Sequence, residues 1–504
     1  MVFPSFALAL PGNTSITNTL TTELHTDNKN GNSTDDDYGL ILNRMNVTGS
    51  NAGDFGSLTH QFRIDAARFF DAPTEDFENF GRLERLSFRY QKDSWKLTVG
   101  DYFRQLGKGI VLSIRKMDEA GLDYALRGAQ AAYSGDNLDL SIFGGYGNSA
   151  NLDPVSQHFI DDHHVFASED LLTGASLETR IYSGLSWGIY GLFNQPKKDP
   201  NISVRNQSTS AGSFLDFRNS ADTLSIYVEG DWQQRKEFGI SKDATAAYLL
   251  STAYLGDYTL IAEALFMDDF LQQGSTNSAL SRPYAYNQPP TLERFDQEVL
   301  NNRNVQGGRL RIERSFFEPD LILYANFMHR STDAGEPAEI RQLHGYAGFE
   351  LGMFEDNGRL MAAAGYRDER TPDGDPVKSM SHWEVDYTHF LGGGYSVHTA
   401  SLNEHRKRPI QGGGDLNYTR GSTYLEFDKS ALGSLGMELG YDSEKDEEGI
   451  ANTFLAGFMK WEITGQIHMR AVGGTQRGGI KCVGGVCREY PGFAGGRLEL
   501  IGSL

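Results

Sequence analysis

The chain has 504 residues, but its composition does not suggest the three or so soluble domains that this length usually implies. Glycine occupies 57 positions, aromatic residues make up 12% and proline occupies only 15 positions. This mixture suits many strands joined by turns and is poor material for helices. The net charge of −21 argues against a nucleic-acid partner, because phosphate binding needs a basic face.

The first nine residues form a short apolar segment that ends in Ala7-Leu8-Ala9. This pattern is typical of the tail of a signal peptide, although a basic region is missing. A disordered N-terminus is the alternative. We expect residues 10–504 to form a single domain.

Runs of about ten residues alternate between apolar and polar side chains along the whole chain. Residues 58–66 give a clear example: Leu58, Phe62 and Ile64 point one way, whereas Gln61, Arg63 and Asp65 point the other. This is the period of a strand with two different faces. A transmembrane barrel strand has this pattern, so it never scores as hydrophobic overall.

The connections between these runs alternate between short polar turns and longer stretches. The longer stretches are 27–37, 71–81, 103–120, 148–173, 196–208, 233–242, 270–305, 332–340, 368–378, 405–414, 444–451 and 477–492. Outer-membrane barrels have short periplasmic turns and long extracellular loops. The sequence therefore predicts an all-β fold, a transmembrane antiparallel up-and-down β-barrel of about 24 strands (range 20–26), with both ends periplasmic.

Residues 103–120 differ from the other predicted loops. Their middle, Ile110–Ile114, is apolar, and their flanks carry the cations Arg104, Lys108, Arg115 and Lys116. An apolar run is unfavourable in water, so we expect this loop to fold inward and bring its cations near the pore axis. An extra strand or a subunit contact is the alternative. Residues 148–173 and 270–305 are expected to be long extracellular loops.

Charges occur on the predicted lumen face in nearly equal numbers of both signs. The cations are Arg63, Arg85, Arg89, Lys96, Arg180, Arg309, Arg311, Arg470 and Arg497, and the anions are Asp65, Glu178, Glu229, Glu263, Glu313, Glu384, Asp386, Glu438 and Glu499. So many charges require a wet or partner-filled interior. Their balance in number gives no argument for ion selectivity.

No combination of residues predicts catalysis, so we do not expect an enzyme or a resident cofactor. H-E-x-x-H, G-x-S-x-G and C-x-x-C-H do not occur. The most ligand-like cluster is Asp161, Asp162, His163 and His164, for which a solvated acidic loop facing lipopolysaccharide is the favoured interpretation over a metal site. The same holds for 35–37, where calcium is the alternative on an extracellular loop.

Cys482 and Cys487 are the only cysteines and enclose Gly484 and Gly485. The glycines allow a tight reversal, so a local disulfide in an oxidising compartment is the favoured interpretation. A two-cysteine metal site is the alternative, but no histidine flanks the pair closely.

Three segments near the inward loop, 100–103, 107–113 and 115–119, together with the cysteine-containing segment 476–488, resemble those of an uncharacterised barrel family of myxobacteria and related envelopes. The chain also resembles large porin-like outer-membrane proteins over nearly its full length. Neither resemblance implies an activity. A TonB-dependent transporter would need an N-terminal plug of well over 100 residues, whereas strands begin here near Thr14.

Two functions from different classes fit these features. The first is a porin-like channel for polar solutes, narrowed by 103–120, in the outer membrane of a Gram-negative bacterium. The second is a structural barrel that encloses or anchors a partner subunit such as a lipoprotein, a cytochrome or a secretion component. A lumen of 24 strands would be wider than that of a 16–18-stranded porin, so a plugging or periplasmic partner is a serious rival to the simple pore. Outer-membrane lipid and lipopolysaccharide are expected to surround the barrel.

Overall fold

The computed structural model describes residues 13–28, 33, 36–72, 74–75, 77–117, 122–153, 157, 170–198, 206–277, 282–293, 304–355, 357–410, 413–444, 452–483, 486–490 and 492–504, the side chains of 277, 282, 479–483 and 486–490 excepted. Residues 1–9, the predicted signal-peptide remnant, lie outside these ranges. No helix in the described parts of the chain is long and apolar enough to cross a membrane.

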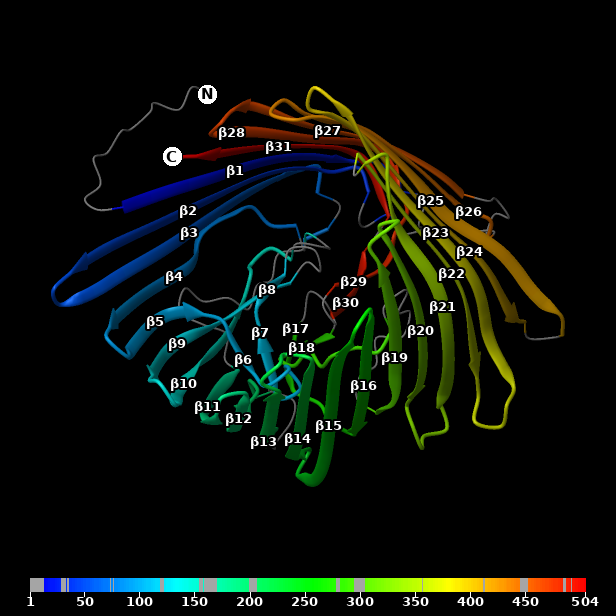
Figure 1. Ribbon diagram of the computed structural model, residues 1–504. Helices are drawn as coiled ribbons and strands as arrows, with labels where there is room; N and C mark the ends of the chain where they lie inside the picture. The colour runs from blue at the N-terminus through cyan, green and yellow to red at the C-terminus, as the bar shows by residue number, and fades with distance from the viewer. Residues whose placement is uncertain are drawn as a thin grey trace.

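The chain forms a closed antiparallel barrel of 24 strands, as predicted (Figure 1). The wall strands are β1 (Asn13–His25), β2 (Gly39–Gly53), β3 (Gly56–Phe70), β4 (Phe80–Lys92), β5 (Trp95–Tyr102), β9 (Leu122–Ser134), β10 (Leu138–Ser149), β11 (Leu171–Tyr182), β12 (Leu185–Gln195), β13 (Gln207–Arg218), β14 (Leu224–Glu237), β15 (Ile240–Leu255), β16 (Tyr258–Asp268), β19 (Val305–Phe316), β20 (Leu321–Thr332), β21 (Ile340–Met353), β22 (Gly358–Arg370), β23 (Pro376–Gly392), β24 (Tyr395–Pro409), β25 (Asp415–Lys429), β26 (Gly433–Asp442), β27 (Asn452–Thr464), β28 (Ile467–Gln476) and β31 (Phe493–Ser503).

Each wall strand pairs with the next along the chain, and β1 pairs with β31 to close the sheet, with Leu20 opposite Leu500. Closure removes the sheet edges that would otherwise expose unpaired backbone groups to lipid. β1 begins and β31 ends at the edge of the barrel that carries tight turns such as Asp93–Ser94. By the asymmetry of outer-membrane barrels, this edge is periplasmic.

The two faces of the wall differ as the alternation predicts. On β14, Val228 and Trp232 are exposed on the outer face, whereas Tyr227, Glu229 and Asp231 are buried on the inner face. Residues directly opposite each other in neighbouring strands share a face, so the register extends this assignment around the barrel. Apolar side chains therefore face lipid, and polar side chains face the lumen.

One predicted long connection is wrong. β14 continues to Glu237 and β15 starts at Ile240, so 233–242 is a hairpin with the two-residue turn Phe238–Gly239. Both turn residues have positive φ, 50° and 85°, as a tight hairpin turn requires. The polar residues that suggested a loop are strand residues: Gln233 and Arg235 are buried inside the barrel, and Gln234 and Lys236 alternate with them on the outer face. Long and short connections therefore do not alternate strictly.

Several short strands lie inside the ring of wall strands (Figure 1). They are β6 (Arg104–Leu106), β7 (Leu112–Ile114), β17 (Gln273–Asn277), β18 (Arg282–Ala285), β29 (Gly479–Val483) and β30 (Val486–Tyr490), and β8 (Lys116–Met117) adds two residues beside β9. They belong to three of the predicted long connections. The largest buried apolar cluster of the described residues forms where β6 and β7 meet the wall.

Candidate functional site in the lumen

The segment after β5 turns inward and forms a small hairpin. β6 pairs with β7, with Arg104 opposite Ile114 and Leu106 opposite Leu112. Its tip depends on two glycines, because Gly107 and Gly109 have φ of 50° and 90°, which are costly for other L-residues. The amide of Gly109 donates to the Leu106 carbonyl at 2.9 Å and closes the turn. We call residues 104–114 the lumen hairpin.

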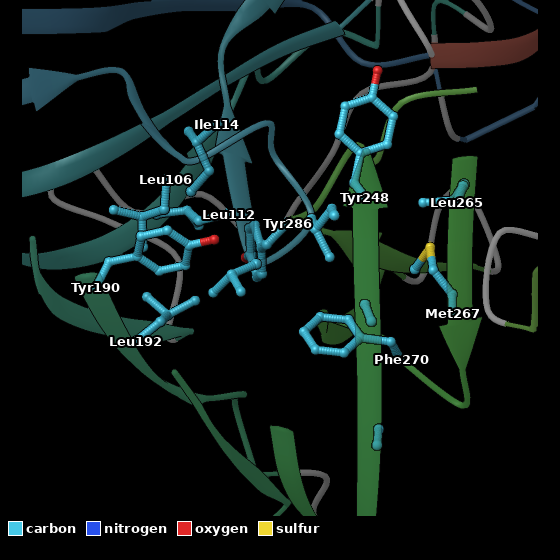
Figure 2. Close-up of a cluster of buried hydrophobic side chains, with 14 of the residues drawn as sticks. Leu106, Leu112, Ile114, Tyr190, Leu192, Tyr248, Leu265, Met267, Phe270 and Tyr286 are labelled. Carbon is cyan, nitrogen blue, oxygen red and sulfur yellow. The ribbon is translucent and has the colours of Figure 1, made fainter. Parts of the chain in front are cut away.

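The apolar middle of the lumen hairpin is fully buried. Ile110, Val111 and Leu112 have no exposed surface, and Leu106 and Ile114 are at most 2% exposed. They belong to one cluster with inner-face residues of the wall, which include Tyr190, Leu192, Tyr248, Leu265 and Met267 (Figure 2). Burying one such side chain contributes about 1.5–3 kcal/mol, so five of them contribute on the order of 10 kcal/mol to docking of the hairpin.

The tip of the lumen hairpin is anchored to a buried carboxylate on β14. Glu229 accepts hydrogen bonds from the Lys108 amide at 2.8 Å, the Tyr190 hydroxyl at 2.5 Å and the Tyr227 hydroxyl at 2.6 Å. The Lys108 ammonium lies 4.5 Å from the centre of the Tyr227 ring. A Cβ at Gly107 would lie 2.2 Å from Glu229 Oε1, so only glycine permits this approach.

A second inward segment packs on the lumen hairpin. The Ser113 amide donates to the Tyr286 carbonyl at 2.8 Å, and the Gln288 amide donates to the Gly109 carbonyl at 2.9 Å. Arg115 Nε donates to Gln288 Oε1 at 2.7 Å. The described part of 270–305, predicted as a long extracellular loop, thus folds into the barrel, because its aromatic residues share the apolar cluster of the hairpin.

The Tyr286 side chain ties this second segment to the start of β11. Its hydroxyl donates to Asp170 Oδ2 at 2.7 Å. Burial, together with the negative charge of Asp170, raises the pKa of the Tyr286 hydroxyl well above its ordinary value. The tyrosine therefore stays neutral and keeps this hydrogen bond throughout the physiological pH range.

A polar cavity of about 500 Å³ is lined by the wall strands β1–β4, β28 and β31 and by Phe103 and Lys116, which flank the lumen hairpin. Its charged lining includes Arg44, Arg63, Lys116, Arg470, Arg497 and Glu499. Most of the charged side chains in its walls form ion pairs. Arg63 binds Asp65 at 2.5 Å and also contacts Asp123, and Arg85 binds Asp123 at 2.8 Å.

The remaining predicted lumen residues lie on the inner face by register, but apart from one another. Arg309 binds Glu263 at 2.6 Å, and Arg311 binds Glu313 at 2.5 Å, both on the wall of β16 and β19. Arg89 and Lys96 lie on β4 and β5 near the periplasmic edge. Arg104 and Lys108 lie on the lumen hairpin, and Arg115 and Lys116 follow it.

The predicted metal and disulfide residues are only partly described. Asp161, Asp162, His163 and His164 lie outside the described residues, and the described residues contain no group of three potential metal ligands. Cys482 and Cys487 are directly opposite each other in the backbone register of β29 and β30. Their side chains are not described, so the disulfide stays a prediction.

The sequence did not identify Tyr190, Tyr227 or Asp123 as site residues. Tyr190 and Tyr227 lie on the inner face, so the alternation that identified Glu229 could have selected them as well. Asp123 is out of phase with Leu126, the residue of β9 that packs in the apolar cluster, so alternation would not have selected it. Nothing in the local sequence indicates that the two tyrosines meet the hairpin tip, because that contact joins segments far apart in the chain.

Among solved structures, the fold is similar to the siderophore receptor PirA from Pseudomonas aeruginosa, with TM-score 0.52 and 8% identity over 98% of this chain and 80% of that chain. It is also similar to a variant of the ferric enterobactin receptor PfeA from the same organism, with TM-score 0.50 and 7% identity over the same shares. The outer-membrane protein OpdK matches with TM-score 0.39 and 11% identity over 98% of this chain and 99% of that one.

No protein-family model and no curated protein matches the sequence. At these identities the likeness to solved structures establishes the barrel fold and nothing finer. The resemblance to an uncharacterised barrel family of myxobacteria stays a prediction.

Proposed function

We propose that this barrel is a porin-like outer-membrane channel for polar solutes, with a constriction built by the lumen hairpin and residues 282–293. The fold and its likeness to outer-membrane proteins point to an outer-membrane location in a Gram-negative bacterium. The observation that carries the proposal is the hairpin itself. It docks on one side of the lumen through Ile110–Leu112 and Glu229, and its flanking residues Phe103 and Lys116 line a charged cavity of about 500 Å³.

This arrangement suits a selective channel better than a wide unobstructed pore. A barrel of 24 strands encloses a wide lumen that would leak if it were empty. Inward segments that dock through apolar contacts narrow it without adding charge to the docked surface. Polar solutes would then pass along the charged part of the wall, where ion pairs such as Arg63–Asp65 keep the surface wet.

The experiment is single-channel recording of the purified protein in planar bilayers. We expect steady conductance that rises when 105–116 is replaced by a short Gly-Ser linker. The matched control shortens 334–338, a connection of similar position whose described residues do not pack in the lumen cluster, and should leave the conductance unchanged. Equal conductance of the wild type and the linker variant would refute the constriction.

A barrel that encloses a partner subunit is the second candidate. It is favoured by the placement of the inward segments. Among the described residues, their apolar contacts lie on the wall of β5 and β9–β20 and leave the walls of β21–β28 without such contacts. In that case the purified barrel is silent in bilayers and a second protein copurifies with it from native membranes. Steady conductance of the isolated barrel excludes this candidate.

A further inference from the structure

Charges on the lumen wall are balanced in number, but their placement is uneven. Most of the inner-face cations contact a carboxylate: Arg309 binds Glu263, Arg311 binds Glu313 and Arg497 binds Glu23 at 2.8 Å. Neutralised pairs of this kind attract no particular ion. Selectivity would come from cations that lack a carboxylate partner.

Arg89, Lys96 and Arg104 are such a group, which we call the cation triad. Among the described residues none of the three forms an ion pair with a carboxylate. Arg89 lies opposite Thr98, the next inner-face residue of β5 after Lys96. Arg104 donates to Ser141, and in the sheet only Ala132 separates Ser141 from Lys96. Three like charges therefore gather on one patch of the inner wall, formed by β4, β5 and the start of the lumen hairpin.

Arg104 is held by neutral partners. Its Nη2 atom donates to Ser141 Oγ and to Ser176 Oγ, both at 2.6 Å, and its guanidinium lies 5.3 Å from the centre of the Phe143 ring. These contacts fix the guanidinium in place but leave its charge unbalanced. Its Nε atom is buried and has no hydrogen-bond partner within the described structure.

The register fixes where the triad lies. Arg89 is opposite Thr98, and Lys96 is opposite Gln91 on β4 and Ala132 on β9. Lys96 is the second residue after the Asp93–Ser94 turn, so the patch reaches from the base of the hairpin toward the periplasmic mouth. A solute that passes the hairpin would meet the triad before it leaves the barrel.

We propose that the cation triad is a binding site for the anionic group, carboxylate or phosphate, of a polar solute that crosses the barrel. The inference rests on the proposed channel function and adds its substrate class. An anion bound here relieves the mutual repulsion of the three cations and uses the free donors of Arg89 and Lys96. Guanidinium and ammonium groups are well suited to both kinds of anion. A patch of one sign also concentrates counter-ions in the passage.

The test compares wild-type protein with the triple variant Arg89→Gln, Lys96→Gln, Arg104→Gln in planar bilayers under a potassium chloride gradient. We expect the wild type to prefer chloride to potassium and to be blocked by added inorganic phosphate or acetate. In the triple variant the preference should disappear and the block should weaken by about tenfold or more. Comparing phosphate with acetate decides which anionic group the site prefers.

The control variant Arg311→Gln, Glu313→Gln removes an ion pair from the inner wall without changing the net charge, and its selectivity should match the wild type. Heat-modifiable migration on gels checks that each variant is folded. The inference is overturned if the wild type conducts without anion preference, or if the triple variant keeps the preference of the wild type. Neither result would refute the proposed channel function. If the protein does not conduct, calorimetric titration of the detergent-solubilised barrel with phosphate and acetate still decides whether the triad binds anions.

Discussion

Glu229→Ala tests how the lumen hairpin is held. The substitution removes the acceptor of the Lys108 amide and of two tyrosine hydroxyl groups. A hydrogen bond to a charged group contributes about 1.5–3 kcal/mol, so the lost bond to Lys108 alone lowers the ratio of docked to undocked hairpin by roughly ten- to hundredfold. Apolar burial on the order of 10 kcal/mol still favours docking, so the hairpin opens more often but stays docked on average.

Hydrogen exchange of backbone amides measures this opening directly. In Glu229→Ala, protection of residues 104–114 should fall by about tenfold or more, while protection of the wall strands stays unchanged. Bilayer recordings should show an unchanged mean conductance with more frequent brief transitions. Glu229→Gln keeps an acceptor, so its protection at 104–114 should lie between that of the wild type and that of Glu229→Ala. Unchanged exchange at 104–114 in the alanine variant would show that the carboxylate does not anchor the tip.

Three further outcomes are expected. Ile110→Asn places an unpaired amide in the apolar cluster and should release the hairpin, which raises the mean conductance; an unchanged mean conductance contradicts the docking. Arg309→Ala leaves Glu263 without its ion pair, so it should lower the stability against guanidinium by more than the double variant Arg309→Ala, Glu263→Ala does. Leu425→Arg faces lipid and should cost about 2–4 kcal/mol near the midplane, whereas Ser422→Arg on the inner face of the same strand should cost far less; equal free energies of unfolding in liposomes would contradict the assigned faces.

The wall of the barrel could be predicted because its signal is local. Alternation such as that of 58–66 assigns the two faces within one strand, and tight turns such as 93–94 mark the strand ends. The same rule failed at 233–242, since polar residues in a strand that lines a wide lumen look like those of a loop. Side chains on the inner face of a large barrel need not be apolar, so polarity alone does not separate strand from loop there.

The lumen hairpin could be predicted only in outline. Its apolar run indicates that it avoids water, but its wall contacts depend on residues far along the chain such as Glu229 and Gln288. The triad illustrates the same limit. Equal numbers of positive and negative residues suggested a balanced lumen. The imbalance appears only when the ion pairs of the folded chain show which cations have a carboxylate within reach.

The seam between β1 and β31 has a consequence for how the protein is made. Leu20 and Leu500 are neighbours in the sheet but lie almost a whole chain length apart, and Arg497 reaches Glu23 across the same seam. The last wall strand, β31, must therefore be synthesised and inserted before the free edge of β1 can be paired. Until then the nascent chain has two unpaired edges, which expose it to aggregation and to proteases. Escape from degradation would thus depend on synthesis of the final strand, so substitutions at the seam should lower the amount of assembled protein more than equal changes elsewhere in the wall.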